Sequence, residues 1–79
     1  MAKPRKRLPS DLPRAKVLAA ITRLGFILDR EGGRHSVYKD PADLSRMMVI
    51  PRHSQIKKQL LQGILAGASV SEEDFMSKY

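Results

Sequence analysis

The sequence predicts a small α+β domain in which two helices cover one face of a three-stranded antiparallel sheet. The chain has 79 residues, enough for one domain with a modest core. Two stretches carry apolar residues at helical spacing, and three short stretches between them are rich in β-branched, aromatic and other apolar residues. An amphipathic helix and a sheet each have one apolar face, so both helices are expected on the same side of the sheet.

The first helix is predicted over residues 13–24, where apolar side chains recur on one helical face. Pro13 suits the first turn of a helix, and Asp11 is the expected N-terminal cap just before it. Gly25 is a stop signal, because glycine readily takes the conformation that ends a helix. The apolar face consists of Val17, Leu18, Ala20, Ile21 and Leu24.

Three strands joined by short turns follow, which predicts an antiparallel meander. Residues 31–34 are expected to form the first turn, because the paired glycines Gly32 and Gly33 accept positive φ angles. Pro51 ends the last strand, since proline cannot donate a hydrogen bond to a sheet ladder. The strands are predicted at residues 26–28, 35–39 and 46–50, with a second turn at 40–43.

A second helix is predicted over residues 55–67, with Ser54 as its N-terminal cap. Gly63 inside this helix suggests close packing at that point. Ser71 is expected to cap a further short helical turn that brings Phe75 back onto the core. The order helix, three strands, helix is also that of double-stranded-RNA-binding domains, which is an analogy at the level of the fold.

The chain is strongly basic, with 15 lysine and arginine residues against eight acidic ones and a net charge of +7. Such a charge attracts polyanions, nucleic acid above all. An acidic partner protein, an anionic membrane surface or a merely solvated basic surface would also account for it. Residues 1–10 hold four cations without apolar periodicity and are expected to form a flexible basic arm, which leaves 11–79 as the single folded domain.

Several classes of function are disfavoured by what the sequence lacks. There is no cysteine, so neither a disulfide nor a thiolate metal site can form, and a reducing, cytoplasmic location is expected. No apolar run approaches the roughly 20 residues that a membrane-spanning helix needs. Two histidines without paired carboxylates do not indicate a metal site, and no cofactor is expected because no cofactor-binding motif is present.

The two histidines, His35 and His53, lie beside turns in arginine-rich surroundings rather than in an apolar stripe. A neutral imidazole can accept or donate a proton near pH 7, which suits general acid–base catalysis. RNA carries its own nucleophile, the 2′-hydroxyl group, so a ribonuclease needs only a proton-transfer group and cations around the phosphate. His35, flanked by Arg34 and Lys39, could supply both, and the competing interpretation is an ordinary surface histidine. Gly32 and Gly33 would let a phosphate backbone approach closely.

Taken in chain order, several short motifs of this sequence resemble those of HicA-type toxins over residues 13–75. The matching motifs are KVL at 16–18, LGF at 24–26, REGGRHSVY at 30–38, IPRH at 50–53, IKK at 56–58, IL at 64–65 and VSEEDF at 70–75. The resemblance implies a double-stranded-RNA-binding-like fold and a ribonuclease toxin that cleaves messenger RNA and is silenced by a HicB-type antitoxin. In such toxins the histidine after the glycine turn is catalytic, a role that carries over to His35. The Pro-x-His element carries over to Pro51 and His53, with a structural or RNA-contacting role.

The chain departs from the family pattern at three positions. Arg34 stands where many members have serine, which keeps the histidine but adds a charge beside it. Gln59 replaces a glycine that is usual near the start of the second helix, and Ser69 replaces one that commonly follows that helix.

The working hypothesis is a metal-independent endoribonuclease in which His35 is the general acid or base and the RNA 2′-hydroxyl group attacks the adjacent phosphate. Two alternatives remain open, namely an RNA-binding module without catalysis and a basic interaction protein for an acidic partner. The sequence leaves the cleavage preference and the oligomeric state open. The residues predicted to contact RNA are Gly33, Arg34, Lys39, Arg52, His53 and Lys57.

Overall fold

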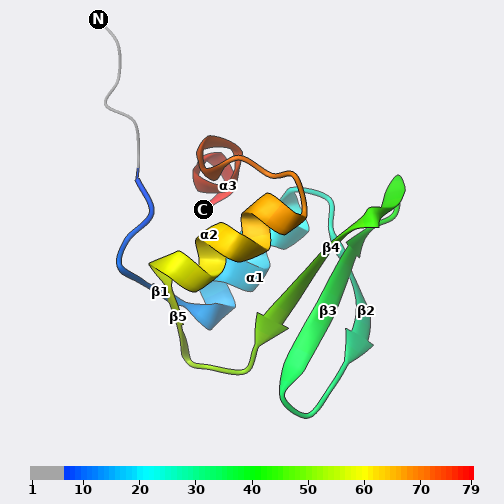
Figure 1. Ribbon diagram of the computed structural model, residues 1–79, viewed down its shortest axis with the longest axis horizontal. Helices are drawn as coiled ribbons and strands as arrows, with labels where there is room; N and C mark the ends of the chain where they lie inside the picture. Colours follow the sequence, from blue (N-terminus) through cyan, green and yellow to red (C-terminus); the bar gives the residue numbers. More distant parts are fainter. Residues whose placement is uncertain (1–6) are drawn as a thin grey trace, which may run out of the picture.

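Three helices and two small antiparallel sheets make up the part of the chain that a computed structural model describes, residues 7–79 (Figure 1). In chain order the elements are β1 (Asp11–Pro13), α1 (Arg14–Arg23), β2 (Ile27–Glu31), β3 (His35–Asp40), β4 (Asp43–Pro51), β5 (Gln55–Lys57), α2 (Lys58–Gly67) and α3 (Glu72–Lys78). Strands β2, β3 and β4 form the predicted antiparallel meander, and β1 pairs with β5 in a separate ladder. The predicted α+β class and the order α-β-β-β-α are confirmed.

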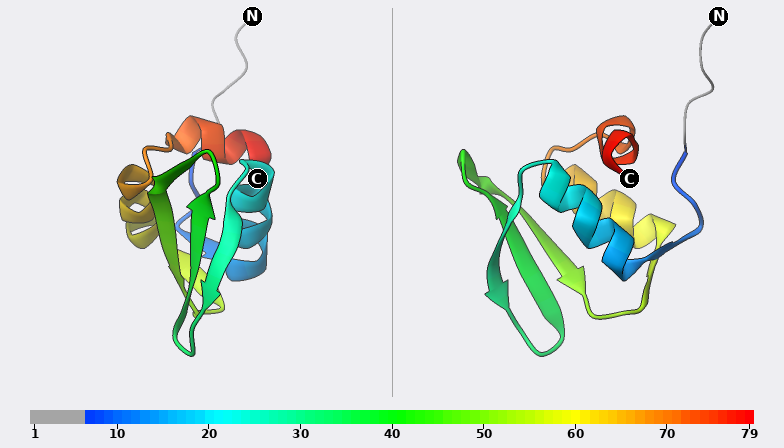
Figure 2. Two further views of the ribbon diagram at one scale, coloured as in Figure 1. Left: turned by 90° about the vertical axis from the view of Figure 1, so that its right-hand side faces the viewer. Right: turned by 180° about the vertical axis from the view of Figure 1, so that it is seen from behind.

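Helices α1 and α2 lie in one layer against one face of the β2–β3–β4 sheet, as predicted (Figure 2). The view from the sheet side shows the opposite face of the sheet uncovered by any other described element. This open face is the surface on which the candidate site lies. The core between the layers contains Leu12, Val17, Ala20, Ile21, Phe26, Met48, Ile50, Ile56, Leu61, Leu65 and Ala68.

The C-terminal helix α3 packs against α1 and closes the end of the core. Its cap is the predicted one, because the Ser71 side chain accepts a hydrogen bond from the Asp74 amide at 3.0 Å. Phe75 is fully buried, as expected, and its ring lies 5.6 Å from the ring of Tyr79 between centroids.

The starts of α1 and α2 differ from the prediction. Helix α1 begins one residue later and α2 three residues later, and neither helix has a side-chain cap. The residues expected to cap them, Asp11 and Ser54, belong instead to the segments that form and flank the β1–β5 ladder. The Arg14 amide at the start of α1 donates to the Ser54 carbonyl at 2.9 Å. The Lys58 amide at the start of α2 donates to the Ser10 carbonyl at 3.0 Å. Each helix therefore has one of its free N–H groups satisfied by the segment that precedes the other helix.

The predicted basic arm falls mostly on residues 1–6, which lie outside the described part of the chain. Within the described part, Leu8 is buried in the core and the Ser10 carbonyl bonds to α2. The division into an arm and a domain at residue 10 stays a prediction.

Helix α1 ends at the predicted glycine. Gly25 has φ +102°, and its amide donates to the Thr22 carbonyl at 3.0 Å while the Phe26 amide donates to the Ile21 carbonyl at 3.1 Å. These are the two bonds of a Schellman motif, in which a residue of left-handed conformation ends the helix.

Helix α2 ends in the same way, but with serine in place of glycine. Ser69 has φ +57°, and its amide donates to the Ala66 carbonyl at 3.1 Å. The Val70 amide donates to the Leu65 carbonyl at 2.9 Å. The backbone here has the conformation that glycine adopts most easily, so the departure from the family pattern at Ser69 carries a conformational cost.

Two predictions about glycines are wrong. Gly63 does not mark close packing, because a Cβ atom added there would meet no atom of the described residues within 4 Å. Gly32 and Gly33 do not use positive φ angles in the β2–β3 turn. A Cβ atom on Gly32 would instead lie 3.0 Å from the His35 carbonyl oxygen, so close approach of two backbone segments explains the glycine.

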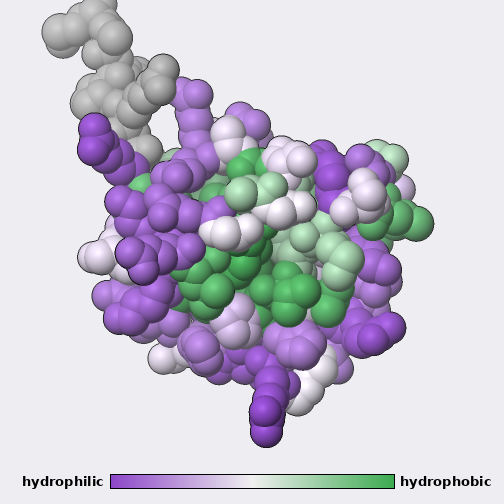
Figure 3. Space-filling view, in the orientation of Figure 1, coloured by the Kyte–Doolittle hydropathy of each residue, from purple (hydrophilic) through white to green (hydrophobic). Residues whose placement is uncertain are grey.

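Exposed apolar side chains gather in a shallow hollow between α2 and β4, near the centre of the face in Figure 3. The open space over Gly63 and Gly67 forms part of it. The hollow is lined by Met47, Met48, Val49, Gln59, Leu60, Gly63, Ile64 and Gly67, none of which belongs to the predicted site.

Candidate functional site

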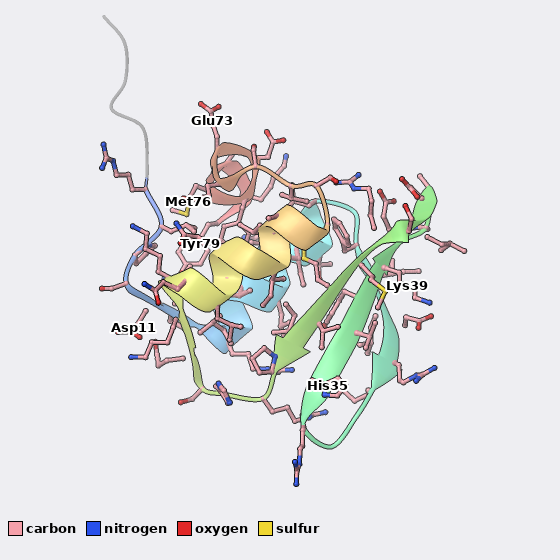
Figure 4. All side chains as sticks on the ribbon, viewed as in Figure 1. Asp11, His35, Lys39, Glu73, Met76 and Tyr79 are labelled. Carbon is pink, nitrogen blue, oxygen red and sulfur yellow. The ribbon has the colours of Figure 1, made fainter. Side chains whose placement is uncertain are left out.

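His35 is the first residue of β3 and lies at the tip of the β2–β3 hairpin, opposite Pro51 of β4 (Figure 4). Its neighbour Ser36 is buried and pairs with the core residue Ile50. Because side chains alternate along a strand, His35 points to the open face of the sheet, and it is exposed. The Nε2 atom lies 3.9 Å from where a Cβ atom of Gly32 would be, so the ring sits over the turn.

Arg52 holds the hairpin tip from the segment between β4 and β5. Its amide donates to the Arg34 carbonyl at 2.9 Å, and its Nε atom donates to the Gly32 carbonyl at 2.9 Å. Its Nη2 atom lies 2.7 Å from Glu31 Oε1. Together with the bond from the Gly32 amide to the His35 carbonyl at 2.8 Å, these contacts fix the loop that carries the imidazole. Two of the three guanidinium nitrogens of Arg52 are therefore engaged with the protein itself.

A second arginine reaches the same hairpin from the helix side. Arg14, the first residue of α1, donates from Nε to the Pro51 carbonyl and from Nη2 to Ser36 Oγ, both at 2.8 Å. The Ser36 hydroxyl group in turn donates to Glu31 Oε1. These contacts form a continuous series of polar side chains, from Arg14 through Ser36 and Glu31 to Arg52, next to His35.

The Glu31 carboxylate stays ionised among these polar side chains. The hydrogen bond from Ser36 lowers the pKa of Glu31 below its usual value, and the positive charges of Arg52 and Arg14 lower it further. A carboxylate whose pKa is lowered accepts a proton poorly. Glu31 is therefore a fixed negative charge in the site rather than a second proton-transfer group.

Four of the predicted RNA contacts lie around His35. Gly33 and Arg34 are exposed in the turn, and the Arg34 side chain makes no hydrogen bond or ion pair with any residue from 7 to 79. Arg52 bonds to the turn as described, and the next residue, His53, is exposed. The glycine turn and the Pro-x-His segment, 16 or more residues apart in the sequence, therefore meet in space.

The other two predicted contacts lie elsewhere. Lys39 is on β3 toward the opposite end of the sheet from His35 (Figure 4), and its Nζ atom lies 3.4 Å from Asp29. Lys57 is on β5, outside the three-stranded sheet, and its Nζ atom lies 3.0 Å from Asp11. The predicted basic face is thus divided between distant parts of the surface.

The prediction missed several residues of the site. Arg30 pairs with Val37 across the sheet, which places it on the open face with His35, and it is exposed. Glu31 and Ser36 are cross-strand partners on either side of the turn, a relation that a longer predicted hairpin would have shown. Nothing in the sequence relates Arg14 to Pro51, 37 positions later.

Within residues 7–79, no group of three or more histidine, cysteine, aspartate or glutamate side chains is placed to hold a metal ion. None of the helices in this part of the chain has the length and apolar character needed to cross a membrane.

Comparison with known proteins assigns the class. A family model described as "HicA toxin of bacterial toxin-antitoxin" matches residues 14–70, well over half of the chain. The matched region runs from the start of α1 to the segment after α2 and includes the whole hairpin and the Pro-x-His segment. The protein is therefore the toxin of a toxin–antitoxin system, and an antitoxin is its partner. Specifically, the chain belongs to the HicA toxin family, as the motifs predicted. The comparison with curated proteins finds no match.

Proposed function

We propose that this toxin is a metal-independent endoribonuclease that cleaves messenger RNA, with His35 as general acid or base. The observation that carries the proposal is an exposed imidazole on a hairpin tip whose backbone is held by hydrogen bonds. A proton-transfer group must come within hydrogen-bond reach of the reacting oxygen, and an exposed ring at a fixed position can do so. Arg30 and Arg34 supply positive charges beside the imidazole, and their side chains have no partner among residues 7–79.

The proposed reaction is an internal transesterification of RNA. The 2′-oxygen forms a bond to the adjacent phosphorus, and the bond from phosphorus to the 5′-oxygen of the next nucleotide breaks. One proton leaves the 2′-hydroxyl group and another reaches the departing 5′-oxygen; neutral His35 can accept the first, or protonated His35 can donate the second. Arginines near the phosphate stabilise the charge that develops on its oxygens. The products are a 2′,3′-cyclic phosphate and a 5′-hydroxyl end.

The residues proposed to contact RNA differ in their distance from His35. We expect Gly33, Arg34 and His53, which are exposed near His35, to touch the nucleotides next to the scissile phosphate. Arg52 is expected to contact them through the part of its side chain that stays exposed. Lys39 and Lys57 can contact only a longer RNA, because each lies away from His35.

The antitoxin is proposed to be of the HicB type, and the site of action to be the cytoplasm, where messenger RNA is found. Support comes from membership of the HicA family and from the net charge of +7, which favours an acidic partner. Co-expression with the product of an adjacent acidic reading frame should restore growth and yield a stable complex. Growth arrest that no neighbouring product relieves would contradict this part of the proposal.

The test of the activity is RNA cleavage in EDTA by the parent protein and by His35→Ala. We expect cleavage with cyclic phosphate ends from the parent and a loss of at least about 100-fold in His35→Ala. His53→Ala removes an exposed imidazole that is proposed only to contact RNA, so it should raise KM and leave kcat within about threefold of the parental value. Salt-sensitive RNA binding without any cleavage by the parent would favour the non-catalytic alternative. Equal cleavage by parent and His35→Ala would remove His35 from the mechanism.

A further inference from the structure

We propose that Arg14, Ser36 and Glu31 are positioning residues that, with Arg52, fix the hairpin tip for catalysis. These four side chains are called the positioning network below. The inference rests on the proposed function, in which the histidine at this tip transfers a proton. Arg14, Ser36 and Glu31 are not needed to explain the chemistry itself, since His35 and the arginines beside it supply it.

The tip needs such a network because the core does not hold it. All five residues of β2, Ile27 to Glu31, are exposed, and within residues 7–79 β2 is an edge strand that pairs only with β3. The turn after it is built of exposed or partly exposed residues. A hairpin end with few buried apolar contacts opens easily unless polar contacts close it.

The contacts of the network all fall on the residues that border His35. Arg14 bonds to Ser36, which follows His35 in the chain, and to Pro51, which faces His35 across the sheet. Ser36 is only 1% exposed, so its hydroxyl group is in a place where hydrogen bonds are strong and water does not compete.

Glu31 links the two arginines. It accepts from Ser36 and pairs with Arg52, which also bonds to the carbonyls of Gly32 and Arg34. The imidazole therefore stands on a backbone tied to α1 on one side and to the β4–β5 segment on the other. A displacement of about 1 Å at a reacting group can cost on the order of 100-fold in rate, so loss of these ties should lower kcat.

The turn between β3 and β4 provides a matched control at the other end of the sheet. There the Asp43 carboxylate accepts a hydrogen bond from the Ser45 hydroxyl group at 2.6 Å, as Glu31 does from Ser36. The hydrogen bonds of Ser45 lower the pKa of Asp43, so both carboxylates lose the same charge when changed to amides. Asp43→Asn and Ser45→Ala thus repeat the chemistry of Glu31→Gln and Ser36→Ala away from His35.

The experiment measures two properties of these four variants and the parent. The first is cleavage in EDTA, analysed as kcat and KM. The second is amide hydrogen exchange of Gly32 and Arg52, whose N–H groups bond within the tip. For Glu31→Gln and Ser36→Ala we expect exchange at least about tenfold faster and kcat about 10- to 100-fold lower, with KM within about threefold. The two control variants should match the parent in both.

Each outcome decides the inference. Unchanged exchange in Glu31→Gln and Ser36→Ala overturns it, whether or not the parent cleaves RNA. Faster exchange with parental kcat also overturns it, because the tip is then loosened without consequence. A parent that does not cleave RNA refutes the proposed function instead, and the exchange data still show whether the network holds the tip. If Ser36→Ala fails to fold, Glu31→Gln decides alone, since its partly exposed amide keeps an acceptor for Ser36.

Discussion

Replacing Ser69 with glycine should stabilise the protein, although the change removes a side chain and makes no new contact. Ser69 ends α2 with φ +57°, a left-handed conformation that costs an L-residue about 1–2 kcal/mol and costs glycine almost nothing. Glycine gains freedom in the unfolded chain, which offsets about 0.4–1 kcal/mol of this. The Ser69 side chain is exposed and makes no hydrogen bond with residues 7–79, so nothing else is lost.

The expected net gain for Ser69→Gly is about 0.5–1 kcal/mol, which corresponds to a rise in Tm of about 2–8 °C for a domain of this size. Urea unfolding and thermal melts followed by circular dichroism measure it. Ser69→Asn should fall between serine and glycine, because asparagine tolerates the left-handed region better than most residues. Ser69→Ala keeps the Cβ atom and should give no gain. A Ser69→Gly protein that is no more stable than the parent would refute the argument from backbone conformation.

Three further outcomes follow from the structure. Gly63→Ala should raise the free energy of unfolding by about 1 kcal/mol, because a Cβ atom there meets nothing within 4 Å and glycine is a poor helix former; a decrease in urea unfolding experiments would point to hidden packing. Gly32→Ala should lower RNA cleavage more than stability, because its Cβ atom would press on the His35 carbonyl at 3.0 Å. Measurements of kcat and Tm test this, and an equal effect on both would contradict it. Glu31 has a pKa in the folded state below its ordinary value of 4.5, so its stabilising contribution is present above that pH and is lost as the pH falls through the folded pKa. Urea unfolding across acidic pH should therefore show a shallower loss of stability in Glu31→Gln than in the parent, and parallel curves would exclude this role.

The sequence was sufficient for the features that depend on local pattern. The apolar spacing of α1 and α2, the stop at Gly25 and the cap at Ser71 are all set by residues within a few positions of one another. The β2–β3 turn was placed correctly, although for the wrong reason, because the φ angles of a glycine pair cannot be read from its composition.

Features that depend on distant pairing were missed. Asp11 and Ser54 fit the pattern of helix caps, yet β1 pairs with β5 more than 40 positions later and takes over that task through the backbone. Charge in the sequence also does not reveal position in space. Lys39 shares the face of His35 but lies four residues along the strand, roughly 13 Å away at the rise of a β-strand. Arg14, which does reach the site, gave no signal at all.

The central claim is that the imidazole of His35, exposed at the held hairpin tip, transfers a proton during RNA cleavage. The measurement that tests it most directly is the single-turnover cleavage rate of His35→Ala in EDTA, taken together with the Kd of the same variant for the same RNA. We predict a rate at least about 100-fold below that of the parent and a Kd within about threefold of the parental value. A variant that binds as tightly and cleaves as fast as the parent would contradict the account.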